Sequence, residues 1–396
     1  METEFVEKKS KLIWIILTVL VVAGAIVGYF MYLNGAKVPV DEEKSVVSTS
    51  GTIPQKVLDN KFGFLSGGED DNPFVSNAGA AWVRPHPGPF LWDAMQKSST
   101  SQIDFSATDE IVKNQQTQNY GTLVTLWPFA DWDQVGRSDA SNCAVSEMDE
   151  FLPRNDTKGR MDYLPQYRCN PSDWEAYSAW VSAVVERYDG DGQGDMPGLK
   201  IPVKYWEVMN EPDLNYQSNA PVEDSQRLNF YNEGPAEYGE LLKSTYSAIK
   251  QADSEAQVLI AGAAGGDDKM LAFYETLFSN MPDASNYFDI ANVHCISNDR
   301  QTQDFNVTAY SETLENAGIK KPIWVTEAEA MYGDSAQENY QNTLQSTKGA
   351  LSAGAEKIFY TRYDLGDTRT DMSEKKAPSE SSMKQSEKWY EDITSL

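Results

Sequence analysis

Short apolar runs rich in β-branched and aromatic residues alternate with longer amphipathic stretches along most of this chain. Such alternation is typical of parallel strands joined by covering helices. The runs with the length and composition of strands are residues 62–65, 81–84, 122–127, 203–209, 258–261, 290–294, 323–326 and 357–360. The clearest helical stretches are residues 173–188, 236–251, 270–278, 307–317, 336–352 and 383–393. The count and order predict an α/β fold, a (β/α)8 barrel whose function resides in the loops after the strands.

A doubly wound open sheet is the competing architecture for such a pattern. That fold commonly carries a Gly-rich phosphate loop directly after a strand, and the nearest candidate here, residues 262–266, lacks the glycine spacing of a dinucleotide site. Residues 131–171 are too long for an ordinary strand-to-helix connection. We expect them to form either a lid over the site or a structural insertion.

Near its beginning the chain contains an uncharged apolar segment, residues 12–33. As a helix this segment would extend about 33 Å, enough to cross the hydrocarbon core of a bilayer. The small residues that a signal peptidase would need sit inside the apolar run, which favours an uncleaved signal anchor over a cleavable signal peptide. Lys8, Lys9 and Lys11 precede the segment and only Lys37 follows it closely. The positive-inside rule then places the N-terminus in the cytoplasm.

The expected organisation therefore has four parts. Residues 1–11 form a cytoplasmic N-terminus, and residues 12–33 form one transmembrane helix. Residues 34–56 are polar, rich in Ser and Thr and without periodicity, which is typical of a flexible stalk. Residues 57–396 form the barrel. This arrangement predicts a single-pass protein of the cell membrane whose barrel faces outward.

Charge and ligand-type residues exclude several functions. With 33 Lys and Arg against 60 Asp and Glu, the net charge is −27, and such a chain repels nucleic acid. Two histidines and three cysteines without clustered spacing predict no metal site. Cys143 and Cys169 bracket a polar loop that an oxidising compartment could cross-link, although two free thiols remain an alternative.

Two glutamates stand at the ends of expected strands. Glu211 lies in the run Trp-Glu-Val-Met-Asn-Glu-Pro after the fourth strand, and Glu327 ends the seventh strand in Trp-Val-Thr-Glu. The carboxyl ends of barrel strands share one mouth, so both side chains are expected to point into it. Retaining glycoside hydrolysis needs such a pair, one carboxyl to protonate the leaving oxygen and one carboxylate to attack the anomeric carbon. Glu207 and Glu329 remain alternatives, because side chains that alternate along a strand can share a face.

With these motifs the chain resembles the clan A glycoside hydrolases, retaining (β/α)8 enzymes with an Asn-Glu-Pro acid/base on strand four and a nucleophilic Glu on strand seven. The resemblance covers most of residues 57–396 and implies no cofactor. It implies that Glu211 is the acid/base, that Glu327 is the nucleophile and that Asn210 binds the sugar 2-hydroxyl. Arg84 resembles the arginine that, in this clan, lies beneath the nucleophile and holds it ionised.

The two histidines and several aromatic residues complete the expected site. His86 and His294 follow or end expected strands, so we expect them to form active-site hydrogen bonds. The clan often has a tyrosine shortly after the second histidine, but Cys295 follows here, and the expected contact with the nucleophile is missing. Trp127 and Tyr360 are candidate platforms under the sugar, with ordinary barrel packing as the alternative.

These observations predict a membrane-tethered retaining glycoside hydrolase that acts on extracellular oligo- or polysaccharides. A non-catalytic carbohydrate-binding barrel is the alternative, favoured by the missing tyrosine and by an aromatic content of 11%. Transglycosylation would use the same residues and differ only in the acceptor.

Overall fold

The computed structural model describes residues 51–65, 73–86, 88–146, 152, 163–214, 229–296, 303–366 and 378–396. The chain divides into two units, residues 1–48 and 49–396, and the first unit lies outside the described residues. The expected signal anchor at residues 12–33, the cytoplasmic N-terminus and most of the stalk therefore lie outside them too. Within the described ranges, none of the helices is both long and apolar enough to span a bilayer.

Eight parallel strands make the inner layer of the second unit. They are β1 (Phe62–Leu65), β2 (Trp82–Arg84), β3 (Gly121–Leu126), β4 (Tyr205–Val208), β5 (Gln257–Leu259), β6 (Ala291–Cys295), β7 (Ile323–Ala328) and β8 (Ala355–Tyr360). The spatial order is β5-β4-β3-β2-β1-β8-β7-β6. Parallel bridges from Leu259 to Ile290 and from Ala263 to Val293 join β5 to β6. The sheet thus closes on itself, which confirms the barrel and excludes the open doubly wound sheet.

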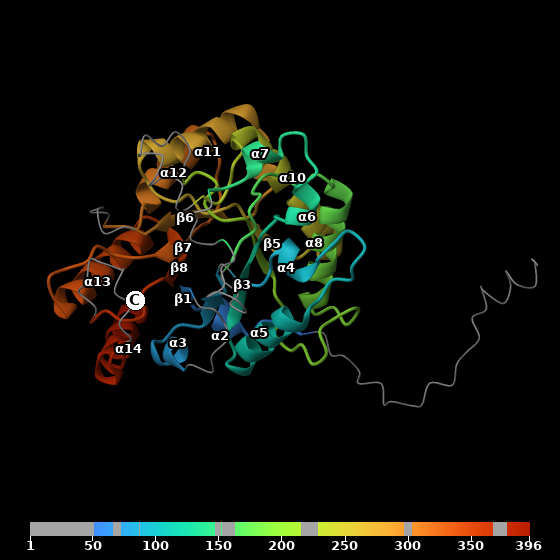
Figure 1. Ribbon diagram of the computed structural model, residues 1–396. Helices are drawn as coiled ribbons and strands as arrows, with labels where there is room; N and C mark the ends of the chain where they lie inside the picture. The colour runs from blue at the N-terminus through green and yellow to red at the C-terminus, as the bar shows by residue number, and fades with distance from the viewer. Residues whose placement is uncertain are drawn as a thin grey trace, which may run out of the picture. The chain divides into compact units, whose positions relative to one another are not determined.

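Helices form the outer layer around these strands (Figure 1). The longer ones are α5 (Ser106–Thr117), α8 (Trp174–Tyr188), α10 (Pro235–Ala252), α11 (Asp268–Asn280), α12 (Val307–Asn316), α13 (Ala336–Ser352) and α14 (Glu380–Thr394). Short helical elements are α2 (Gln55–Leu58), α3 (Phe74–Asn77), α4 (Trp92–Met95), α6 (Asp131–Gln134), α7 (Ala140–Cys143) and η1 (Ala284–Asn286). The six helices expected from the sequence are present, with bounds that differ by a few residues.

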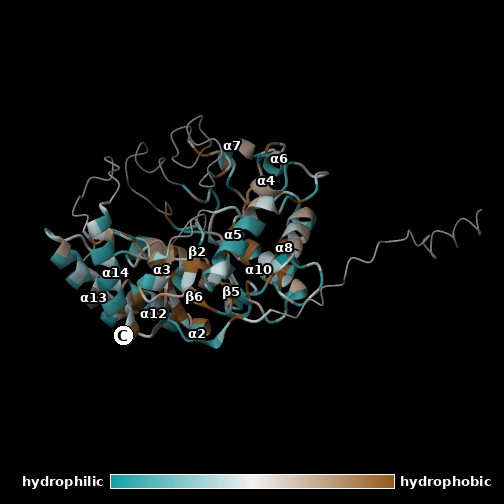
Figure 2. Ribbon diagram, turned by 90° about the horizontal axis from the view of Figure 1, so that it is seen from below, coloured by the Kyte–Doolittle hydropathy of each residue, from teal (hydrophilic) through white to brown (hydrophobic). Residues whose placement is uncertain are grey.

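The strands are buried on both faces, as parallel strands between a filled barrel and a helical layer must be. The helices turn polar faces outward, and the teal surfaces of α13 and α14 are plain in Figure 2. Side-chain capping marks where α8 begins. The Asp173 carboxylate accepts a hydrogen bond from the Ala176 N–H in its first turn.

A small apolar cluster fills the barrel at the N-terminal ends of the strands. Its buried members include Trp82, Leu123, Leu259 and Trp324. The Lys357 ammonium lies 4.5 Å from the Trp82 ring and donates to backbone carbonyls of the segment before β1. This end of the barrel is thus mainly apolar, whereas Glu211 and Glu327 come from the opposite, C-terminal ends of β4 and β7.

The folded unit already includes residues 51–56, which the sequence assigned to the stalk. The Gly51 N–H donates to the Gly190 carbonyl at 3.1 Å, and α2 begins at Gln55. The Val57 side chain is completely buried in the apolar cluster. The sequence pattern hid this packing because the segment before Val57 is mostly polar.

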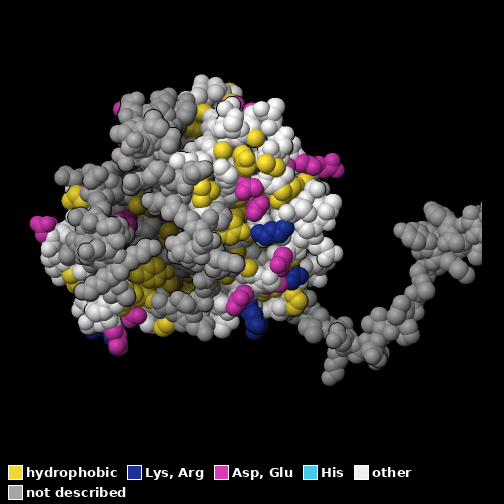
Figure 3. Space-filling view, viewed as in Figure 1, with side chains coloured by type: hydrophobic (Ala, Val, Ile, Leu, Met, Phe, Trp, Pro, Cys, Tyr) yellow, Lys and Arg dark blue, Asp and Glu magenta, His cyan; other side chains and the backbone are white. Residues whose placement is uncertain are grey.

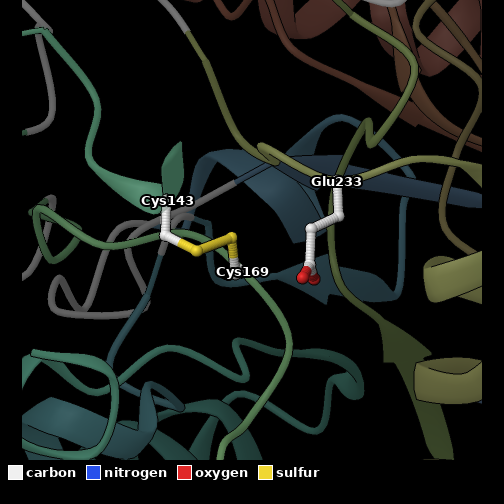
Figure 4. A group of neighbouring side chains, drawn as sticks. All are labelled: Cys143, Cys169 and Glu233. Carbon is white, nitrogen blue, oxygen red and sulfur yellow. A yellow bond between two sulfur atoms is a disulfide. The ribbon is translucent and has the colours of Figure 1, made fainter. Parts of the chain in front are cut away.

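A disulfide between Cys143 and Cys169 ties together the long segment between β3 and α8. Figure 4 shows the bond with the Glu233 carboxylate beside it. Glu233 accepts hydrogen bonds from the Asn170 N–H at 2.6 Å and from Arg137 at 3.1 Å. The bridge resolves the alternatives left open for the two cysteines, and the described part of residues 131–171 is fastened to the segment before α10. The choice between a lid and a structural insertion also depends on residues 147–151 and 153–162, which lie outside the described residues.

Candidate active site

Arg84, on β2, connects three side chains at the C-terminal end of the barrel. Its Nε donates to Glu207 Oε2 at 2.8 Å, its Nη1 to Glu327 Oε1 at 2.6 Å and its Nη2 to Asn210 Oδ1 at 2.7 Å. The guanidinium is fully buried. A planar fork with separate donors suits this task, because each acceptor comes from a different direction. Arg84 therefore links β4 to β7 under the expected nucleophile.

The two expected catalytic glutamates meet across His294. One carboxylate oxygen of Glu211, one of Glu327 and a ring nitrogen of His294 all lie within 4.8 Å of one another. His294 Nδ1 is 2.7 Å from Glu211 Oε1 and 3.8 Å from Glu327 Oε1. Glu211 adopts a backbone φ of +41°, a left-handed conformation that non-glycine residues seldom adopt and that clusters at functional sites.

An irregularity in β7 explains how neighbouring residues both reach the site. Pairing of β7 with β6 skips one residue, so that Val293 pairs with Val325 but His294 pairs with Glu327. The pairing with β8 shifts over the same stretch, between Val325 and Ala328. Such a bulge breaks the alternation of side chains along a strand. Thr326 consequently contacts His294 while Glu327 contacts Arg84.

The alternative carboxylates occupy different places. Glu207 is fully buried and accepts from Arg84, Thr125 and Asn292. Glu329, at the barrel rim, accepts a hydrogen bond from Thr361. Glu211 and Glu327, in contrast, have carboxylate oxygens within 4.8 Å of each other beside His294.

Burial shifts the pKa values of both glutamates upward. The pKa of Glu211 rises to about 7, because desolvation penalises its anion and the charge of Glu207 adds to the effect, while Arg84 acts in the opposite direction. Burial also raises the pKa of Glu327, and here His294 and the directly bound Arg84 oppose the rise. One cation thus serves three buried carboxyl groups. This balance favours a protonated Glu211 beside an ionised Glu327.

Both histidines are neutral in this environment. Burial lowers the pKa of His294 to about 4 and lowers that of His86 well below its usual range. His86 Nε2 lies 3.7 Å from Glu327 Oε1, and its ring packs 5.6 Å from that of Trp127. Among the described residues, His86 Nδ1 and Asn210 Nδ2 are buried polar atoms without a hydrogen-bond partner. Both are candidate contacts for a bound sugar.

Of the two expected aromatic platforms, Trp127 lies near the site and Tyr360 does not. Trp127 lies beside His86 and packs against Phe230. The Tyr360 hydroxyl is instead 2.9 Å from Thr347 on α13, and its ring packs in the layer between sheet and helices, against Tyr390. Tyr360 is a core residue, so the packing alternative holds for it. Alternation decides this outcome, because its side chain points outward from β8.

The surface is hollowed in the region where Figure 1 places β7, β8 and β1. Figure 3 shows this hollow in the same view, with hydrophobic side chains on one wall. A concave site with apolar walls and a few converging polar groups is typical of small-molecule binding.

Sequence reasoning missed a group of polar residues beneath the glutamates. Asn292 donates a hydrogen bond to Glu207, and Thr326 shares one with His294. Gly262 has no side chain, which leaves room for the His294 ring. A Cβ on Gly262 would lie 2.1 Å from His294 Nε2. The sequence signal for Asn292 and Thr326 is a polar side chain within an otherwise apolar strand. A polar side chain buried in this way requires a hydrogen-bond partner.

Comparison with known proteins identifies the family of this chain. The family model described as the glycosyl hydrolase catalytic core matches residues 157–386. The chain belongs to this family. It is therefore a glycosidase, and the expected resemblance to the clan A glycoside hydrolases is confirmed. No curated protein matches the sequence.

Solved glycosidases share the fold of this glycosidase. It is similar to a glucosidase from Croceicoccus marinus, with 17% identity and a TM-score of 0.52 over 80% of this chain and 63% of that chain. It is also similar to a β-galactosidase from the psychrophilic Marinomonas ef1, with 11% identity and a TM-score of 0.50 over 85% of this chain and 59% of that chain. The glycosidase thus spans about three fifths of the length of either structure.

The missing tyrosine after His294 leaves Glu327 with other partners. Arg84 donates to Glu327 directly, and His294 and His86 lie within 3.8 Å of the same oxygen. The absent tyrosine favoured a non-catalytic barrel. The ion pair between Arg84 and Glu327, which the sequence alone could not show, weakens that argument.

Proposed function

We propose that this glycosidase retains the anomeric configuration and acts through Glu211 and Glu327 on O-glycosidic bonds of extracellular oligo- or polysaccharides. The observation that carries the proposal is the separation of the two carboxyl groups, whose nearer oxygens lie within 4.8 Å. Retaining enzymes hold their carboxyls about 5 to 5.5 Å apart, whereas inverting enzymes leave about 6.5 to 9.5 Å for a water molecule. The short separation supports a double displacement.

The assignment of roles follows the electrostatics. Glu211, with its raised pKa, protonates the leaving glycosidic oxygen while the Glu327 carboxylate attacks the anomeric carbon. The glycosidic bond breaks and a glycosyl ester on Glu327 forms. Glu211 then takes a proton from water, the resulting hydroxide attacks the anomeric carbon, and the Glu327 carboxylate and the Glu211 proton are restored. Arg84 supports the anionic form of Glu327 before attack and after release.

A covalent trap and matched variants test this proposal. With the full-length chain, a panel of 2-deoxy-2-fluoroglycosyl fluorides should label Glu327, as read by mass spectrometry of the modified peptide. Glu211→Gln should lower turnover of phenyl glycosides by about 10²- to 10⁴-fold. Near-normal activity in Glu211→Gln or Glu327→Gln, or a label on Glu329, would contradict the assignment.

The proposal includes attachment to the cell membrane through residues 12–33. The uncharged run and the lysines before it support that topology, and the disulfide between Cys143 and Cys169 suits an oxidising compartment. The full-length protein should remain with membranes after an alkaline carbonate wash, and protease added to intact cells should digest the barrel. Release into the wash, or protection from external protease, would refute the tether.

A further inference from the structure

A chain of hydrogen bonds runs beneath the site from Glu207 to the acid/base. Asn292 Nδ2 donates to Glu207 Oε1 at 2.5 Å, and the Thr326 hydroxyl donates to Asn292 Oδ1 at 2.9 Å. His294 Nε2 lies 2.8 Å from Thr326 Oγ1, and His294 Nδ1 lies 2.7 Å from Glu211 Oε1. All five side chains are buried.

The direction of the chain is set at Glu207. Its carboxylate is paired with Arg84 and can only accept, so the Asn292 amide must turn its NH₂ toward it and its carbonyl toward Thr326. The single proton of the Thr326 hydroxyl then goes to that carbonyl or, at 3.3 Å, to Glu207 itself. On either route, Thr326 Oγ1 can only accept from His294 Nε2.

We propose that Glu207, Asn292 and Thr326 fix His294 in its Nε2–H tautomer, so that Nδ1 accepts a hydrogen bond from the carboxyl group of Glu211, whose proton later goes to the leaving group. This inference rests on the proposed role of Glu211 as acid/base. Thr326 is a positioning residue, because it acts on the acid only through the ring of His294. The neutral state that the tautomer requires agrees with the low pKa of His294.

The tautomer has a consequence for each half of the reaction. Before attack, the Nδ1 lone pair faces Glu211 Oε1 and stabilises the protonated carboxyl by accepting its hydrogen bond. After the proton has left, the same lone pair faces a carboxylate, which makes Glu211 a stronger base toward water. With the opposite tautomer, Nδ1–H would donate to the carboxylate and lower the pKa of Glu211.

Other charged and titratable groups face Glu211 from several elements. They are Arg84 on β2, Glu207 on β4, Asp213 after β4, Tyr274 on α11, His294 on β6 and Glu327 on β7. A substitution at Thr326 changes none of these charges. The contacts that it removes are those of the hydroxyl with His294, with Asn292 and, at 3.3 Å, with Glu207. Replacing Thr326 therefore tests the hydrogen bond that orients His294.

The tautomer is directly measurable because the chain has only two histidines. In the full-length chain labelled with ¹⁵N-histidine, long-range ¹H–¹⁵N spectra distinguish a protonated Nε2 from a protonated Nδ1, and a His86→Gln variant assigns the two rings. We expect the Nε2–H form for His294 in the wild type. The Nδ1–H form would overturn the proposal. This readout needs no substrate, so it remains decisive even if the proposed catalytic roles fail.

Matched variants of Thr326 test the consequence for catalysis. Thr326→Val removes the hydroxyl at nearly constant volume, and Thr326→Ser keeps it. The alkaline limb of kcat/KM should move down by about one pH unit in the valine variant and stay in place in the serine variant. An unmoved limb in Thr326→Val would overturn the proposal.

The leaving group separates this effect from general damage to the site. Phenyl glycosides need protonation of the leaving oxygen, whereas 2,4-dinitrophenyl glycosides of the same sugar depart without it. Thr326→Val should slow the phenyl substrate by about tenfold and the dinitrophenyl substrate hardly at all. Equal slowing of both would show that Thr326 has only a structural role.

Discussion

The Nη1 atom of Arg84 lies 2.6 Å from Oε1 of Glu327, and the same guanidinium also pairs with Glu207. This single buried cation therefore balances two carboxylates, while Glu211 nearby is left to keep its proton. Breaking a buried pair by removing one partner is costly, because it leaves an uncompensated charge. We therefore expect Arg84 to support both the stability of the fold and the negative charge of Glu327, the proposed nucleophile.

Replacement of Arg84 by Lys should damage both properties. A lysine ammonium cannot reach three acceptors that lie in three directions, so we expect the free energy of unfolding to fall by about 3 kcal/mol. The pKa of Glu327 should rise, which moves the acid limb of kcat/KM to higher pH. Arg187→Lys is the matched control, since Arg187 pairs with Asp109 at a partly exposed site. Equal behaviour of the two variants in denaturant titrations and pH profiles would refute this account.

The raised pKa of Glu211 predicts a stability effect that depends on pH. Its folded value of about 7 exceeds the ordinary value of 4.5, so the anion is penalised only in the folded state. The penalty is absent below about pH 4.5, grows as the pH rises and is complete above about pH 7. Glu211→Gln should therefore match the wild type in stability at pH 4.5 and exceed it by about 3 kcal/mol at pH 8. Urea unfolding at both pH values measures this difference, and a constant difference would argue against the shift.

Much of the barrel was predictable from the sequence. The eight strands were found because each is a short apolar run bounded by polar residues. Glu211, Glu327, Arg84 and His294 were predicted to converge because strand ends of a barrel share one mouth, and they do lie together.

The remainder depended on side-chain direction and distance. The bulge at Thr326 changes which residues of β7 face the site, and no local pattern announces it. Tyr360 points outward for the opposite reason, because β8 keeps its regular alternation there. The importance of Gly262 arises from the approach of the segment after β5 to His294, a tertiary contact that no sequence pattern reveals. The expected anchor at residues 12–33 stays a prediction.

Gly262→Ala should displace His294. The new methyl group would lie 2.1 Å from Nε2, so the ring must move and lose its contacts with Thr326 and Glu211. Overpacking of this kind costs about 1 to 3 kcal/mol of stability. We also expect kcat/KM to fall by about tenfold or more. Gly136→Ala is the control, because nothing lies within 4 Å of its added methyl group. Normal activity of Gly262→Ala would show that the approach is not needed.

Reduction of the disulfide should lower stability and leave the chemistry in place. Cys143 and Cys169 are 26 residues apart, and closing a loop of this size stabilises the fold by about 3 kcal/mol. Thermal melting with and without a reductant should show a lower Tm for the reduced wild type. Cys143→Ser should already have the lower Tm and should not respond to the reductant. Cys295→Ala should respond like the wild type, because Cys295 is buried and takes no part in the disulfide.

Asn210 should act on the sugar 2-hydroxyl. Its Oδ1 is held by Arg84, which aims the Nδ2 group that has no partner among the described residues. A hydrogen bond from this group to the 2-hydroxyl strengthens as charge develops at the anomeric carbon, so Asn210→Ala should lower kcat/KM by on the order of 100-fold. The matched probe is the 2-deoxy glycoside of the same sugar, on which the wild type and the variant should differ little. If Asn210→Ala is equally impaired on both substrates, the residue only supports Arg84, and the contact with the 2-hydroxyl is refuted.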